Sequence, residues 1–192
     1  EADSDGTMKV NVQGTENLLH CAQSEVPDTR FFFASSGQVF GDVVESPQKE
    51  STLFNPVSPY GVSKAEATAK VRKAREEGLF AVNGFLYNHE SPRRGVNFVT
   101  QKICLGAAAI SAGKEKELRL GDPSLERDWS DARDMVRGMW LSLQADQPHD
   151  YIFASGQTHT VQEVVEIAFE TVGLNWEHYV VRDESLNRKR EL

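Results

Sequence analysis

The sequence predicts an α/β protein built on a parallel, doubly wound sheet. Helical patterns alternate with short apolar runs along the chain, which is the order expected when each helix crosses back between parallel strands. The apolar runs carry almost no polar residues, as in Phe31-Phe32-Phe33-Ala34, because a strand covered on both faces needs no polar alternation. Polar residues follow these runs directly, where ligand sites lie in open α/β sheets.

Composition excludes several classes of function. The 192 residues carry a formal net charge of −8, which argues against nucleic acid or an anionic membrane as a partner. No apolar run approaches the roughly 20 residues of a membrane span, and no signal peptide opens the sequence. Cys21 and Cys104 lie among apolar residues without metal-ligand spacing. We therefore expect reduced core thiols, no metal site and a cytoplasmic protein.

Each element follows from a local pattern. Helices are indicated by apolar residues at helical spacing, strands by apolar runs, and helix ends by glycines such as Gly78 and Gly173. Thr160-Val161-Gln162-Glu163 is a capping box that begins a helix. The expected helices cover 7–23, 60–77, 98–112, 131–144 and 161–173, the expected strands cover 31–34, 79–86 and 151–154, and a Pro/Ser-rich loop covers 41–59. The helix over 131–144 has an apolar stripe that we expect in the core: Met135, Val136, Met139, Trp140 and Leu143.

The pattern Ser58-Pro59-Tyr60-Gly61-Val62-Ser63-Lys64 begins one of these helices. Ser58 suits the N-cap and Pro59 the first turn. Tyr60 and Lys64 are four residues apart and so share a helical face, where the ammonium should make the phenol easier to ionise. Tyr60 is therefore a candidate general acid and base. Ser36 follows the strand over 31–34, so that a hydroxyl, a phenol and a lysine can meet at one crevice.

This set resembles the catalytic Ser, Tyr and Lys of extended short-chain dehydrogenases/reductases. Asn11-Val12-Gln13-Gly14-Thr15-Glu16-Asn17-Leu18-Leu19 also resembles the helix that precedes the catalytic strand in that family. The resemblance implies a Rossmann-like sheet that serves a nicotinamide cofactor.

A polar loop, Tyr87-Asn88-His89-Glu90-Ser91-Pro92-Arg93-Arg94-Gly95, follows the strand over 79–86. Arg93 or Arg94 could bind phosphate oxygens through a bidentate guanidinium, and Asn88 and Glu90 could bind sugar hydroxyls. The alternative is a solvated loop without a ligand.

The longer stretch narrows the resemblance. Phe85 to Gly95, together with Phe98-Val99-Thr100-Gln101-Lys102-Ile103, is similar to the signature of GDP-mannose 4,6-dehydratases, and the similarity extends from about Lys9 to Gly173. It implies a partial Rossmann domain over 1–90. Residues 91–192 would then mix segments of a smaller C-terminal substrate-binding domain with returning Rossmann elements. No glycine-rich dinucleotide loop occurs in the sequence, so we expect a fragment that lacks the N-terminal glycine-rich part.

The resemblance also implies chemistry and partners. Tyr60, tuned by Lys64, would take the C4 hydroxyl proton of GDP-mannose while NADP is transiently reduced, and Ser36 would hold the developing carbonyl. His89 and Arg94 match cofactor contacts, and Asn88 and Lys102 match positions near the nucleotide sugar. Family members are homo-dimers or homo-tetramers, which we expect here too.

One position departs from the family pattern. Ser36-Gly37-Gln38 stands where dehydratases have Thr-Ser-Glu, and the resemblance makes that Glu the base for the C5 proton. An amide cannot take a proton, so Gln38 would impair elimination by about 10²–10⁴-fold. Two alternatives to the dehydratase therefore stay open: a nucleotide-sugar epimerase or reductase, and a non-catalytic remnant that binds nucleotide sugar.

Overall fold

The structure, a computed structural model, describes residues 4–186, which form two compact units. Unit 1 comprises residues 4–87 and 133–153, and unit 2 comprises 88–132 and 154–186. The chain therefore crosses between the units three times. Whether these units correspond to the cofactor and substrate domains expected over 1–90 and 91–192 stays a prediction. The basic segment at residues 188–190 lies outside the described residues.

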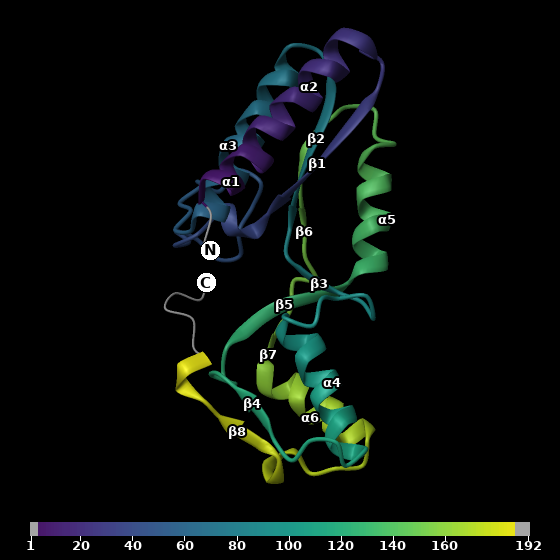
Figure 1. Cartoon of the computed structure of the whole chain (residues 1–192). Helices are drawn as coiled ribbons and strands as arrows, with labels where there is room; N and C mark the ends of the chain where they lie inside the picture. The colour runs from purple at the N-terminus through teal and green to yellow at the C-terminus, as the bar shows by residue number, and fades with distance from the viewer. Residues whose placement is uncertain (1–3, 187–192) are drawn as a thin grey trace. The chain divides into compact units, whose positions relative to one another are not determined.

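Unit 1 is a parallel sheet with helices on both faces, which confirms the predicted fold class (Figure 1). The strand order is β1-β2-β6, with β1 at Arg30–Ser36, β2 at Phe80–Leu86 and β6 at Asp150–Phe153. Both pairings are parallel, and their register sets Ala34 opposite Gly84 and Gly84 opposite Tyr151.

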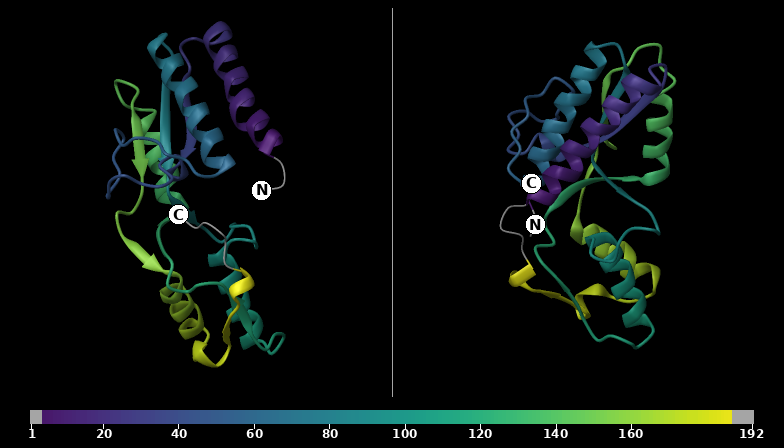
Figure 2. Two further views of the ribbon diagram at one scale, coloured as in Figure 1. Left: turned by 90° about the vertical axis from the view of Figure 1, so that its left-hand side faces the viewer. Right: turned by 45° about the horizontal axis from the view of Figure 1, so that its top comes forward.

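The helices of unit 1 form two layers around this sheet. An N-terminal helix runs through α1 (Ser4–Met8), a π-helical turn η1 (Lys9–Gln13) and α2 (Gly14–Glu25), and it packs beside α3 (Pro59–Glu76) on one face. Helix α5 (Ala132–Ser142) covers the other face, as the two further views show (Figure 2). Gly84 allows this face to pack closely, because a Cβ there would lie 2.4 Å from the Phe32 ring.

Unit 2 contains two helices and two small sheets. Helices α4 (Val99–Ser111) and α6 (Val161–Thr171) pack against each other around Ile103, Val165 and Phe169. The remaining elements of unit 2 are β3 (Asn88–Glu90), β4 (Leu118–Leu120), β5 (Glu126–Asp131), β7 (Thr158–Thr160), η3 (Trp176–His178), β8 (Val180–Arg182) and η4 (Glu184–Leu186). Strand β5 pairs parallel with β3 and antiparallel with β7, and β4 pairs parallel with β8.

Several burial predictions were wrong. Cys21 and Cys104 are free, as predicted, but both are exposed rather than part of the core. On α5 only part of the expected stripe is buried, because Val136 and Trp140 are each 60% exposed. Among residues 4–186, no helix combines the length and the apolar content that a bilayer crossing requires.

Candidate functional site

Ser36 ends strand β1 at the carboxyl edge of the sheet. The strand continues through Ser35 and Ser36, two residues beyond the apolar run, and the backbone then turns into η2 (Gly37–Val39). Ser36 is the N-cap of this turn, and its Oγ accepts a hydrogen bond from the Gln38 backbone N–H at 3.2 Å. The capping geometry therefore fixes the direction of the Ser36 hydroxyl.

Helix α3 begins beside this turn, as the Ser58-Pro59 pattern predicts. Ser58 Oγ accepts a hydrogen bond from Gly61 N at 3.0 Å, and Pro59 occupies the first helical position. The helix also approaches η2 closely, because a Cβ on Gly61 would lie 2.7 Å from the Gln38 carbonyl oxygen. Glycine at position 61 thus allows the first turn of α3 to pack closely on η2.

The structure brings Ser36, Tyr60 and Lys64 together. The Ser36 side chain lies near the Tyr60 phenol and lowers the pKa of that phenol. Lys64 Nζ lies 5.6 Å from the centroid of the Tyr60 ring and donates to the Ala34 carbonyl oxygen at 2.9 Å. Tyr60 remains 38% exposed. A phenol, an ammonium and a serine hydroxyl therefore converge at the end of β1.

Partial burial shifts the ionisation of both α3 residues. It raises the pKa of Tyr60 above its ordinary value, and the Ser36 hydrogen bond opposes this shift without reversing it. Burial lowers the pKa of Lys64. The expected lowering of the Tyr60 pKa is therefore wrong in direction, because the effect of removal from water on the phenolate is the largest contribution.

Gln38 lies next to this group and contacts the start of α3. Its side-chain Oε1 accepts a hydrogen bond from the Ser58 hydroxyl at 3.2 Å. The side chain is exposed. A neutral amide donates and accepts hydrogen bonds but takes up no proton at physiological pH. Position 38 therefore supplies polarity to the site without a general base.

The other predicted binding residues belong to unit 2. Asn88 and His89 lie on β3, opposite Trp129 and Ser130 of β5. Lys102 Nζ donates to the Arg119 carbonyl oxygen at 2.6 Å and so links α4 to β4.

Arg94 is engaged by residues of its own loop. Its guanidinium carbon lies 3.5 Å from the centroid of the Phe98 ring, and its Nε lies 3.3 Å from Glu90 Oε2. Glu90 Oε2 also accepts a hydrogen bond from Thr100 Oγ1 at 2.7 Å. Arg93, by contrast, has an exposed side chain. The loop therefore holds one guanidinium in place and presents another to solvent.

Asn11 is a residue to which sequence reasoning gave no role. Asn11 Nδ2 donates to Ser63 Oγ at 2.9 Å, and Ser63 Oγ donates to the Tyr60 carbonyl oxygen at 2.8 Å. Asn11 lies in the π-helical turn η1, and such turns are frequent at functional sites. The sequence signal that could have identified this contact is Asn11 as the first residue of the Asn11–Leu19 motif. No cluster of potential metal ligands occurs among residues 4–186.

Comparison with known proteins finds relatives that all carry the same name. A family profile described as GDP-mannose 4,6 dehydratase matches residues 2–191. GDP-mannose 4,6 dehydratase 2 of Arabidopsis thaliana is 42% identical over 98% of this chain and 52% of its own length. The human GDP-mannose 4,6 dehydratase is 45% identical over 89% of this chain and 47% of its own length. The chain thus spans about half the length of these curated relatives.

Solved structures of related proteins share the fold of this chain. RMD from Pseudomonas aeruginosa, complexed with NADPH, has a TM-score of 0.89 and 27% identity, covering 95% of this chain and 62% of that chain. The dTDP-glucose 4,6-dehydratase DesIV from Streptomyces venezuelae, with NAD and TYD bound, has a TM-score of 0.80 and 26% identity. The match covers 97% of this chain and 57% of that chain.

Proposed function

The chain belongs to the GDP-mannose 4,6-dehydratase family, and on that premise we propose that the whole protein is a nucleotide-sugar dehydratase. Its substrate would be GDP-mannose and its product GDP-4-keto-6-deoxymannose, with NADP reduced transiently. The observation that carries this proposal is the convergence of Ser36, Tyr60 and Lys64 at the carboxyl end of β1. We also propose that the whole protein is a cytoplasmic homo-dimer or homo-tetramer.

The donor set at this site fits the nicotinamide end of a dinucleotide. Lys64 has three N–H donors, and its bond to Ala34 leaves others for ribose hydroxyls. NADPH in one solved neighbour and NAD in another support a nicotinamide cofactor. Further contacts would come from His89 and Arg94, and Asn88 and Lys102 would bind the nucleotide sugar. When bound, NADP supplies the acceptor and later the donor of a hydride.

The chain's own residues would move and hold protons. Tyr60, as phenolate, would accept the C4 hydroxyl proton of the sugar as C4 is oxidised to the carbonyl that the product keeps. Ser36, already oriented by its cap, would donate a hydrogen bond to the developing carbonyl oxygen. Lys64 would place positive charge near the phenolate and so offset part of the cost of ionising the phenol.

A matched pair of tyrosine variants tests this proposal. In the whole protein, Tyr60→Phe should lower formation of the 4-keto-6-deoxy sugar by about 10²–10⁴-fold, because it removes the proton acceptor. Tyr179→Phe is the control, since Tyr179 stacks on Phe169 in unit 2. Equal activity in both variants would refute the role of Tyr60. Product is measured by chromatography of GDP-mannose reactions.

Gln38 favours a second candidate function. A site with an amide at position 38 could oxidise and reduce C4 without eliminating water, as an epimerase or reductase does. Gln38→Glu separates the two functions, because a carboxylate there can take the C5 proton. We expect the variant to form 4-keto-6-deoxy product about 10²–10⁴-fold faster than the unaltered protein. An unchanged rate would remove position 38 from the elimination step.

A further inference from the structure

Helix α3 carries a polar stripe on the face that it turns toward the sheet. Tyr60, Lys64, Thr68 and Arg72 are spaced four residues apart and therefore share one side of the helix. The first two side chains of the stripe face β1: Tyr60 lies near Ser36, and Lys64 Nζ donates to the Ala34 carbonyl oxygen. The stripe thus continues beyond the two residues of the candidate site.

Thr68 is the next contact along the stripe. Its Oγ1 lies 2.8 Å from Ser35 Oγ, and the pair is buried, with Thr68 0% and Ser35 3% exposed. Ser35 directly precedes Ser36 on β1. A hydrogen bond between two buried hydroxyls has a narrow range of acceptable distances and angles. This contact therefore fixes Thr68 against the strand that ends at the candidate site.

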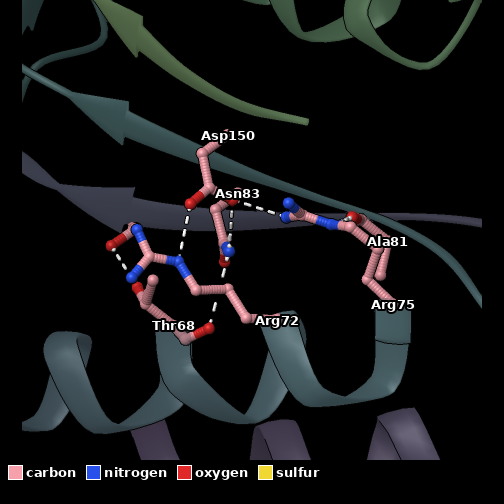
Figure 3. Close-up of polar contacts among 7 residues, drawn as sticks. Thr68, Arg72, Arg75, Ala81, Asn83 and Asp150 are labelled. Atoms are coloured by element: carbon pink, nitrogen blue, oxygen red, sulfur yellow. Dashed lines mark hydrogen bonds and ion pairs between the residues drawn. The ribbon is translucent and has the colours of Figure 1, made fainter. Parts of the chain in front are cut away.

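The far end of the stripe is held by one carboxylate. Arg72 Nε donates to Asp150 Oδ2 at 2.7 Å, and Arg75 donates to the other oxygen of the same group (Figure 3). Asn83 Nδ2, from the buried centre of β2, donates to Asp150 Oδ1 at 2.8 Å. Asp150 begins β6, so these bonds tie α3 to two neighbouring strands.

We propose that Thr68 and Asp150 are positioning residues, which hold α3 in the rotation that sets Tyr60 and Lys64 against β1. The apolar contacts of α3 with the sheet come partly from small or β-branched side chains, Ala67, Val71 and Ala74. Apolar burial is not directional, so it tolerates small rotations of a helix that directional hydrogen bonds resist. Rotation about the helix axis would carry Tyr60 away from Ser36.

A kinetic comparison tests Thr68, and it rests on the proposed function. Thr68→Val keeps the shape of the side chain but removes the bond to Ser35. In the whole protein we expect kcat for GDP-mannose to fall about ten- to a hundred-fold while KM stays within about two-fold, because small misplacements of reacting groups cost this much. Thr68→Ser, which keeps the hydroxyl, should restore most of the activity. The control is Val71→Ala, a buried change one turn along α3 that removes apolar contact and leaves the stripe intact.

A second measurement is independent of activity. The whole protein is labelled with 3-fluorotyrosine, and the fluorine resonance of Tyr60 is assigned through its loss in Tyr60→Phe. Ser36→Ala should shift this resonance, and Thr68→Val and Asp150→Asn should shift it in the same direction. A resonance that Thr68→Val and Asp150→Asn leave in place would overturn the positioning role, whatever the kinetics. Shifted resonances in a protein without dehydratase activity would support positioning and refute the proposed function alone.

Discussion

At the scale of the residue, Ser36 connects the turn after β1 to the phenol of Tyr60. Its Oγ accepts a hydrogen bond from the Gln38 backbone N–H, and its side chain lies near the Tyr60 phenol. Burial raises the pKa of the phenol, and this one hydroxyl lowers it. The ionisation of Tyr60 is therefore set by a desolvation cost that Ser36 partly offsets.

Removal of the Ser36 hydroxyl should make the phenol harder to ionise. Ser36→Ala eliminates the contribution that lowers the pKa of Tyr60, so the pKa should rise further. Because the phenolate is the proposed base, the ascending limb of the pH profile of kcat/KM should move to higher pH. The profile of Ser24→Ala, an exposed serine on α2, should match that of the unaltered protein. A limb that stays in place, or moves to lower pH, would contradict the role of Ser36.

At the scale of the element, helix ends follow local chemistry closely. The predicted capping box of α6 is present: Glu163 N donates to Thr160 Oγ1 at 3.1 Å, and Thr160 N donates to Glu163 Oε2 at 2.6 Å. Gly78 and Gly173 follow α3 and α6 with φ of 102° and 73°, as left-handed helix ends require. These features depend on neighbours in sequence and so are readable without a structure.

Loss of the capping box should destabilise unit 2. Thr160→Ala leaves the Glu163 N–H without its side-chain acceptor, and we expect the free energy of unfolding to fall by about 0.5–2 kcal/mol. Thr171→Ala, near the other end of α6, is the comparison, because its hydroxyl bonds within the helix to the Ile167 carbonyl oxygen. Urea denaturation followed by circular dichroism measures both. Equal stability of Thr160→Ala and the unaltered protein would show that the cap contributes nothing.

At the scale of the whole molecule, unit 1 is assembled from two segments that are distant in sequence. Asp150 comes from the returning segment 133–153, and its partners Arg72, Arg75 and Asn83 come from the first segment. Burial raises the pKa of Asp150, but hydrogen bonds from Arg75, Asn83 and Arg72 outweigh burial, so the pKa lies below its ordinary value. The carboxylate therefore favours the folded state when it is ionised.

The sign of the pH dependence follows from this lowered pKa. An acid whose pKa is lower in the folded state stabilises the protein above its unfolded pKa, and this stabilisation is lost as pH falls through the folded pKa. Asp150→Asn removes the charge that both arginines need. We expect the free energy of unfolding at pH 7 to fall by about 1.5–3 kcal/mol, since hydrogen bonds to a charged group in a partly buried site are weakened.

Stability measured at acidic pH tests the predicted role of the Asp150 charge. Urea denaturation from pH 7 to pH 3 should show a smaller loss of stability for Asp150→Asn than for the unaltered protein. Asp134→Asn, which changes an exposed carboxylate on α5, is the control and should follow the unaltered protein throughout. Parallel curves for all three proteins would mean that Asp150 does not contribute to stability through its charge.

Sequence patterns predicted the elements of unit 1 better than those of unit 2. Helix α3 and strand β2 lie within one residue of their expected bounds. The short strands β3, β4, β7 and β8 were missed, because three residues are too few to show a period and their partners lie far along the chain. The exposure of Val136 and Trp140 was also missed, since an apolar stripe does not say how much of it is covered.

Patterns in the sequence were enough to predict the α/β class, the start and end of the main helices, and the grouping of Ser36, Tyr60 and Lys64. These follow from short-range order, since caps, periods and strand ends depend on neighbouring residues. The direction of the Tyr60 pKa shift and the contacts of Thr68 and Asp150 emerged only from the packed fold. Burial and hydrogen bonding arise when distant segments pack, and no local pattern specifies how much water that packing removes.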